Sequence, residues 1–131
     1  MLNHVMIGSS DIEKTRAFYN AVLGVLGARE PMEHTNDTGQ KRLFYIHNGS
    51  TFSISEPIND EPVTVANGST IGFKCDSPEQ IQELHDVAIA NGGVSIEQPP
   101  GPRHSNMGTM YLCYFQDPDG HKICGIHRPK S

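Results

Sequence analysis

The sequence predicts an α+β fold in which a βαβββ unit occurs twice. The order of strand, helix and three strands in the first half of the chain is repeated from residue 68 onward. The two helix-start signals, Asp11 and Ser77, are 66 residues apart, and the first strands repeat at the same offset. The sheet of each unit has only one face covered by a helix. Pairing two units therefore buries more surface and can wrap the strands around a cavity.

We therefore expect a single domain of two units, at about residues 1–60 and 68–131. Together they should form a cupped mixed β-sheet with the helices on the outside. The residues 56–68 are polar and contain proline and asparagine, so they are the natural connection between the units.

The first unit opens with a strand at residues 2–8, followed by a helix that begins at Ser10 or Asp11. Ser10 and Glu13 fit a capping box, and Asp11 is an equally suitable N-cap. One apolar stripe follows at helical spacing: Ile12, Tyr19, Val22 and Leu26. Three strands are then expected at about 26–33, 41–47 and 51–55, with Asn48-Gly49 as a tight hairpin turn between the last two.

The second unit has clearer signals at its helix. A strand at residues 69–75 precedes Ser77 as N-cap, Pro78 at the first helical position and Gln80 closing the capping box. Strands are expected at about 94–97, 109–116 and 121–126. The residues between the first two, 98–108, are rich in proline and are expected to form an irregular loop.

Composition excludes several classes of partner. The 131 residues carry 10 basic and 15 acidic side chains and show no basic stripe, so nucleic acid is not an expected partner. No run approaches the roughly 20 apolar residues of a membrane span, and the start of the chain shows no secretion signal. Three cysteines without a CxxC pair indicate neither a disulfide framework nor a cysteine zinc site. We expect a cytoplasmic protein.

A polar turn near the end of the chain leads into the last strand. Asp117-Pro118-Asp119-Gly120 suits a type I turn followed by a left-handed glycine, so its residues are explained by local geometry, and His121 is expected to be solvated. Alternation in the next strand places Lys122, Cys124 and Ile126 on one face and His121, Ile123 and Gly125 on the other. The pattern does not say which face is inside.

Two segments, HVMIGSSDIEKTRAFYNAVLG near the start and YFQDPDGHKI near the end, resemble the vicinal oxygen chelate superfamily. This group includes glyoxalase I, the bleomycin- and fosfomycin-resistance proteins and extradiol dioxygenases. The resemblance spans nearly the whole chain, including the duplication. It implies the cupped-sheet fold and a small-molecule ligand, and it also implies a homodimer.

The resemblance also implies up to four metal-ligand positions in the cavity. The first, a histidine in the family, is His4 here; the second, also a histidine, is Thr70. The third, glutamate or glutamine in glyoxalases, is near Ser53, and the fourth, usually glutamate, is Cys124. Catalytic zinc, iron or nickel needs about three imidazole, carboxylate or thiolate ligands. Only His4 and Cys124 are of these types, and Glu56 or His104 would have to complete the set.

The resemblance and the strand alternation together predict the lining of the cavity: His4, Met6, Ser53, Ser55, Thr70, Gly72, Tyr111 and Cys124, with His104 near the mouth. No catalytic residue is assigned. The preferred function is binding or conversion of a small molecule in the cupped sheet without the family's usual metal site and without a known cofactor. Two alternatives remain. One is a glyoxalase-like lyase or isomerase with a divalent metal at His4, and the other is an inactive homologue that acts as an interaction scaffold.

Overall fold

A computed structural model describes residues 1–130 of the chain. The N-terminal half contains β1 (Val5–Gly8), α1 (Ile12–Val25), β2 (Met32–Thr35), β3 (Lys41–His47) and β4 (Ser50–Ser55). Its strands form the N-terminal sheet in the order β1-β4-β3-β2. β1 runs parallel to β4, and the other neighbours are antiparallel.

The C-terminal half repeats this plan. It contains β5 (Ile71–Lys74), α2 (Pro78–Ala90), β6 (Val94–Ser95), β7 (Gly101–Ser105), β8 (Gly108–Gln116) and β9 (Lys122–His127). Its strands form the C-terminal sheet in the order β5-β9-β8-β6, with β7 also paired to β8. As in the first half, the first strand is parallel to the last. The predicted α+β class is confirmed.

Two of the predicted elements are wrong. Residues 98–108 are not an irregular loop throughout, because Gly101–Ser105 form β7 and pair antiparallel with β8. Residues 26–31 are not part of a strand, because Leu26 caps α1 and the Ala28 backbone N–H donates to Leu23 O at 3.1 Å. The apolar residues here close the helix, and the strand begins only at Met32.

The helix starts follow local chemistry. Asp11, one of the two candidates, is the N-cap of α1, and its side chain accepts a hydrogen bond from the Lys14 backbone N–H. Ser77 caps α2 in the same way, with the Gln80 N–H as donor. A side-chain oxygen at this position satisfies a backbone donor that the helix leaves free.

Neither α1 nor α2 has the length and apolar character that a membrane crossing requires.

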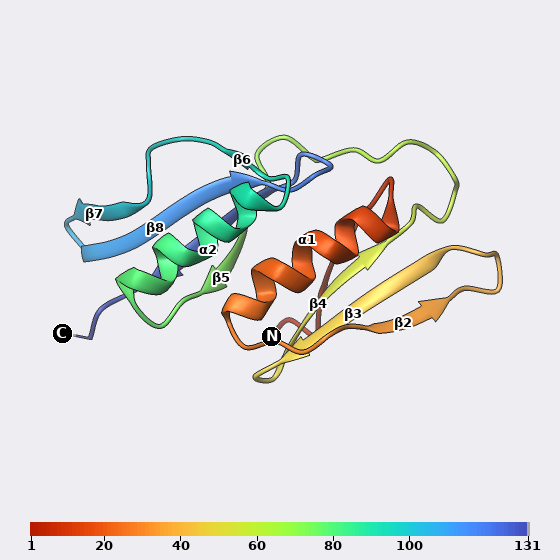
Figure 1. Cartoon of the computed structure of the whole chain (residues 1–131), viewed down its shortest axis with the longest axis horizontal. Coiled ribbons are helices and arrows are strands. Elements are labelled where there is room, and N and C mark those ends of the chain that lie inside the picture. Colours follow the sequence, from red (N-terminus) through yellow and green to blue (C-terminus); the bar gives the residue numbers. More distant parts are fainter. Residues whose placement is uncertain (131) are drawn as a thin grey trace.

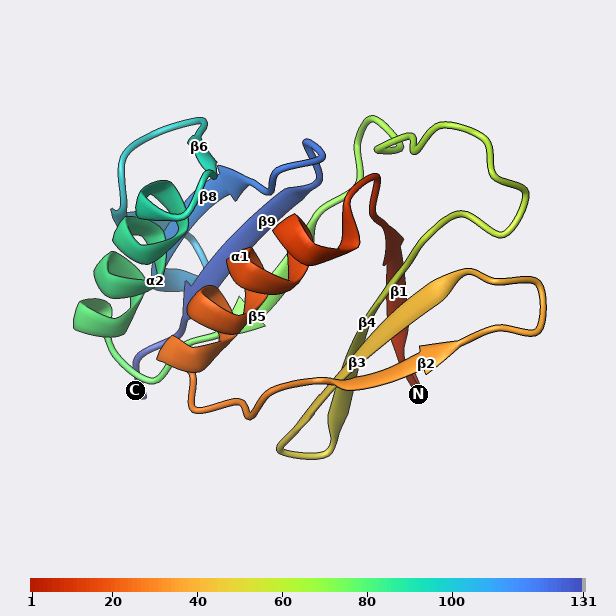
Figure 2. The same ribbon diagram turned by 45° about the vertical axis from the view of Figure 1, so that its right-hand side comes forward.

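The core is built around α1, which lies beside α2 and between the two sheets (Figures 1 and 2). Phe18 points to the C-terminal sheet, with its ring 6.1 Å from that of Phe115 on β8. Tyr19, the next residue, contacts the N-terminal sheet, with its ring 4.9 Å from that of Phe52 on β4. Both side chains are fully buried. One helix therefore supplies core contacts to both halves of the molecule.

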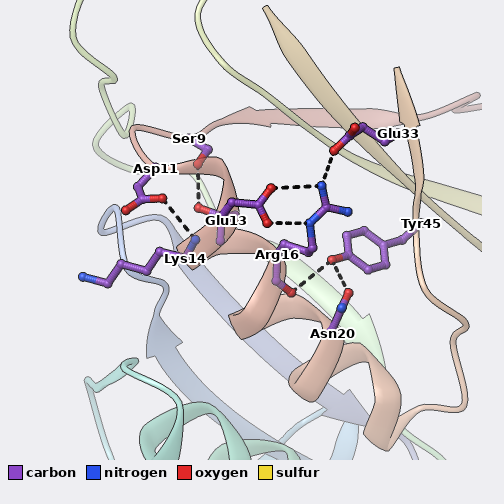
Figure 3. Close-up of polar contacts among 9 residues, drawn as sticks. Ser9, Asp11, Glu13, Lys14, Arg16, Asn20, Glu33 and Tyr45 are labelled. Atoms are coloured by element: carbon purple, nitrogen blue, oxygen red, sulfur yellow. Dashed lines mark hydrogen bonds and ion pairs between the residues drawn. The ribbon is translucent and has the colours of Figure 1, made fainter. Parts of the chain in front are cut away.

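A cluster of polar side chains also connects α1 with strands β2 and β3 of the N-terminal sheet (Figure 3). Arg16 donates to Glu13 on its own helix and forms an ion pair with Glu33 on β2. Tyr45 on β3 donates its hydroxyl hydrogen to Asn20 Oδ1 at 2.8 Å. Ion pairs at a surface stabilise only weakly, by about 0–1 kcal/mol, so we regard this cluster mainly as fixing the position of β2.

The turn between β8 and β9 joins the two halves. Asp117 is 3% exposed, and its carboxylate accepts a hydrogen bond from the Tyr19 hydroxyl at 2.7 Å. Asp119 accepts from the Ser10 backbone N–H at 3.1 Å, and also from the Ser10 hydroxyl. His121 is not solvated as expected: it is 7% exposed, and its Nε2 lies 2.7 Å from Gly8 O. The β8–β9 turn thus holds the β1–α1 junction through polar contacts.

Close packing of α2 against β9 depends on Gly125. Gly125 lies in β9 on the face covered by α2. A Cβ atom at this position would be 2.7 Å from Leu84 Cδ2 on the helix and 3.0 Å from Cys113 Sγ on β8. Leu84 and Cys113 are fully buried, so no space exists to relieve these contacts.

Candidate functional site

Three predicted site residues share the face of the N-terminal sheet turned away from α1. These are Met6, which is paired with Ser53, and Ser53 and Ser55, which alternate on β4; Phe44, also paired with Ser53, points to the same side. Their neighbours of opposite parity, such as Phe52, belong to the core. Ser53 is fully buried, and within residues 1–130 its hydroxyl has no hydrogen-bond partner. Ser55, on the same face, accepts from Arg42 Nε at 3.1 Å.

Two further predicted residues lie together on the C-terminal sheet. Gly72 is paired with Cys124, and a Cβ atom on Gly72 would be 3.0 Å from Cys124 Sγ. Both lie on the face turned away from α2, since Gly125, the next residue in β9, faces the helix. Burial raises the pKa of the Cys124 thiol, while the nearby Lys122 ammonium acts in the opposite direction. The thiol is therefore not activated as a nucleophile.

The remaining predicted residues are not brought to this face. Tyr111 lies on the opposite side of the C-terminal sheet, among the residues that pack against the core. His104 shares that side, because it pairs with Thr109, two residues before Tyr111 on β8. Thr70 is exposed just before β5. His4 is exposed, with its Nδ1 2.8 Å from Asn3 Oδ1.

The residues that the resemblance assigns to the family's metal-ligand positions are poorly suited to a transition-metal centre. Ser53 and Thr70 offer neutral hydroxyls, and the environment of Cys124 disfavours its thiolate. Among residues 1–130, no three histidine, cysteine, aspartate or glutamate side chains gather into a group able to hold a metal ion. Zinc, iron and nickel sites need about three such ligands.

A cavity of about 500 Å³ lies between the two halves, and we call it the central cavity. Its volume falls in the roughly 300–1,000 Å³ range of small-molecule sites. Two of the predicted site residues, His4 and Gly72, line it. Its apolar wall comes from both sheets and from the end of α1: Val5, Leu23, Leu26, Tyr45, Phe52 and Phe73. Its polar wall includes His47, Thr51, Lys74, Asp76 and Gln80.

Two strand edges border the central cavity. β1 pairs only with β4, and β5 pairs only with β9, so each has one edge without a neighbouring strand. Val5 of β1 and all four residues of β5 line the cavity. An unpaired strand edge presents backbone N–H and C=O groups that need partners. The cavity thus combines an apolar wall with backbone donors and acceptors.

A second cavity, of about 480 Å³, has a different character. It lies beside the β1–α1 junction and is lined mainly by polar and acidic residues, among them Gln40, Glu56, Asp60 and Glu61. Gln40 already donates to Asp60 Oδ1 at 3.1 Å. It has no aromatic wall, whereas small-molecule sites are predominantly apolar. The central cavity is therefore the better candidate.

Sequence reasoning missed most of the central cavity. Phe73 and Lys74 on β5, and Tyr45 on β3, were not among the predicted site residues. The repeat could have indicated Phe73 and Lys74. β5 is the first strand of its unit, as β1 is of the other, and the sequence assigns His4, beside β1, to the site. The sequence does not indicate that Leu23 and Leu26, at the end of α1, line the cavity, because they lie in or beside the apolar stripe that is expected of any packed helix.

Comparisons with known proteins agree with this architecture. The family model described as Glyoxalase/Bleomycin resistance protein/Dioxygenase superfamily matches residues 1–124. A glyoxalase/bleomycin resistance protein from Albidiferax ferrireducens T118 has 47% identity and a TM-score of 0.89, covering 98% of this chain and 99% of that chain. The fosfomycin resistance protein FosX from Listeria monocytogenes has 21% identity and a TM-score of 0.70, covering 98% and 92%, which supports the fold alone.

No curated protein matches the chain. The family model nevertheless spans almost all of it, and the similar crystal structure from Albidiferax ferrireducens covers 98% of it. The chain therefore belongs to the glyoxalase/bleomycin resistance protein/dioxygenase superfamily.

Proposed function

We propose that this protein binds a small organic molecule in the central cavity and does so without the metal site usual in its family. The observation that carries the proposal is the cavity of about 500 Å³ between the edges of β1 and β5, with an apolar wall and backbone polar groups at its border. Such a combination is typical of small-molecule sites. The poor fit of Ser53, Thr70 and Cys124 to a metal supports the second part.

Ligand binding is tested by screening metabolites for thermal stabilisation in the presence of a chelator. A ligand at 100 times its Kd stabilises the folded state by about 2.7 kcal/mol. The Ala28→Phe variant adds volume to the cavity wall and should abolish the stabilisation, because Ala28 lines the cavity. Ala90→Phe, at an exposed position at the end of α2, is the matched control. Equal stabilisation of both variants would refute the central cavity as the site.

The absence of the family metal site is tested separately. The protein, purified without chelator, should carry well under one equivalent of transition metal by elemental analysis. Stoichiometric zinc, nickel or iron that is lost in the His4→Ala variant would refute this part of the proposal and support the metal-dependent alternative.

We also propose that the protein is a homodimer in the cytoplasm. The face of the N-terminal sheet turned away from α1 exposes Ile46 by 58% and Met32 by 65%, next to Phe44. Exposed apolar groups of this kind favour association. The three cysteines are free thiols, which suits a reducing compartment. Light scattering coupled to size-exclusion chromatography tests the dimer, and a monomer at micromolar concentration would refute it.

A further inference from the structure

We infer that the ligand of the central cavity is a small aromatic anion, whose ring lies on the aromatic wall and whose charge is held by Lys74. This inference rests on the proposed function and specifies the chemical class of its ligand. It draws on the aromatic wall, the charge at the border of the cavity and the free edge of β5.

Three aromatic residues from three different strands meet at the wall of the cavity. Phe52 on β4 and Phe73 on β5 are edge to face, with ring centroids 5.1 Å apart and an interplanar angle of 85°. Tyr45 on β3 lies 6.4 Å from Phe52. The Tyr45 hydroxyl is occupied by Asn20, and Tyr45 is 2% exposed, so its ring lines the cavity from behind Phe52. Aromatic pairs attract one another beyond the effect of their buried area, which favours an aromatic ligand over an aliphatic one of equal size.

The charge at the border of the cavity favours an anion. Lys74 lines the cavity, is exposed, and forms no ion pair with any carboxylate of residues 1–130. This is notable in a chain with a net charge of −5, where acidic partners are in excess. By contrast Lys122, also on the C-terminal sheet, is paired with Glu97. An ammonium without a protein partner is available to the ligand.

The carboxylate of Asp76 also lines the cavity and opposes the binding of an anion. Asp76 lies immediately before Ser77, the N-cap of α2, where the positive end of the helix dipole offsets part of its charge. Its backbone N–H donates to Gln80 Oε1 at 2.7 Å, which holds the residue at the start of the helix. Asp76 therefore weakens anion binding but does not cancel the contribution of Lys74.

The side chains of Phe73 and Lys74 point to opposite faces of the C-terminal sheet, and the free edge of β5 between these faces supplies further donors. Gly72 is exposed and has no side chain to cover the backbone of this strand. The strand has no neighbour on its cavity side, so part of its backbone N–H groups is unpaired. Hydrogen bonds from backbone N–H groups to a carboxylate or sulfonate are charge-assisted and stronger than neutral ones.

The test uses two fluorescent probes with the same aromatic framework. 1-Anilinonaphthalene-8-sulfonate carries the anionic group, and N-phenyl-1-naphthylamine lacks it. In the Lys74→Met variant the Kd of the anionic probe should rise about tenfold, while the Kd of the neutral probe should stay unchanged. Asp76→Asn should tighten the anionic probe alone. Lys14→Met, on the exposed side of α1 and outside the cavity, is the matched control and should change neither Kd.

The outcomes separate the two proposals. If Ala28→Phe abolishes binding of both probes but Lys74→Met leaves the anionic probe unaffected, the cavity binds small molecules and the inference about charge is refuted. If Ala28→Phe affects neither probe, both proposals are refuted. Circular dichroism of each variant ensures that a loss of binding is not a loss of fold.

Discussion

The β3–β4 turn and the β8–β9 turn occupy equivalent places in the two repeated halves, yet they have different surroundings. Asn48 and Gly49 form the first, with φ of 49° and 82°; both are exposed. The second contains Asp117, which is 3% exposed and accepts hydrogen bonds from Tyr19, Asp119 and His121. The difference shows that equivalent turns of the two repeated units have different structural roles. The first turn contributes Asn48 to the lining of the central cavity, and the second holds the halves together.

Removing the buried carboxylate should have the largest effect. Asp117→Ala leaves the Tyr19 hydroxyl and two backbone N–H groups without their acceptor, and we expect a loss of about 2–5 kcal/mol in the free energy of unfolding. Asn48→Ala, at the equivalent turn, should cost about 1 kcal/mol, because only the positive φ is penalised. Urea denaturation measures both. Similar losses in the two variants would contradict the proposed division between the turns.

A smaller effect is expected at the outer contact of the β8–β9 turn. Ser10→Ala removes the hydroxyl donor to Asp119 but keeps the backbone N–H that binds the same carboxylate. The expected loss is about 1 kcal/mol by urea denaturation. Ser69→Ala, at an exposed position in the connection between the halves, serves as control and should lose no stability. A loss at Ser69 as large as at Ser10 would show that the contact to Asp119 contributes nothing specific.

The smallest effect is a pH dependence. Burial raises the pKa of Asp117 above its ordinary value, although the Tyr19 hydroxyl and His121 act in the opposite direction. The folded state therefore binds this proton more tightly than the unfolded state, so its contribution to stability is full at acidic pH and is lost as the pH rises through the raised pKa. Relative to Asp117→Asn, the native protein should gain unfolding free energy as the pH falls from 7 toward 4. A constant difference would mean that the pKa of Asp117 is the same in the folded and unfolded states, and a shrinking difference would mean that folding lowers it; either result would contradict the prediction.

Local chemistry was sufficient to predict most of the elements. Ser77, Pro78 and Gln80 mark the start of α2 through a cap that depends only on neighbouring residues, and the structure has that cap. β7 was missed because its sequence, GPRHS, has neither alternation nor β-branched residues. It is a strand only because β8 is long enough to pair with it, and such pairing is a tertiary property.

The sequence predicts which side chains of one strand share a face of the sheet, but not which side chains of different strands share a face. Alternation places Ser53 and Ser55 on one face of β4, as the register has them. It did not reveal that Tyr111 and Cys124 lie on opposite faces of the C-terminal sheet, because this depends on the register between β8 and β9. The contacts of Asp117 with Tyr19, 98 positions away in the chain, likewise follow from packing and have no local signal.

The missing side chain at Gly125 has a consequence that reaches the other half of the molecule. It sets how closely α2 can approach its sheet, since even a methyl group would meet Leu84. In the first turn of α2, Gln80 donates to Val25 O at the end of α1, 3.1 Å away, and Gln80 also lines the central cavity. A methyl at 125 would push α2 outward and carry Gln80 with it. The absence of a side chain at position 125 therefore helps to fix the position of Gln80 at the wall of the central cavity.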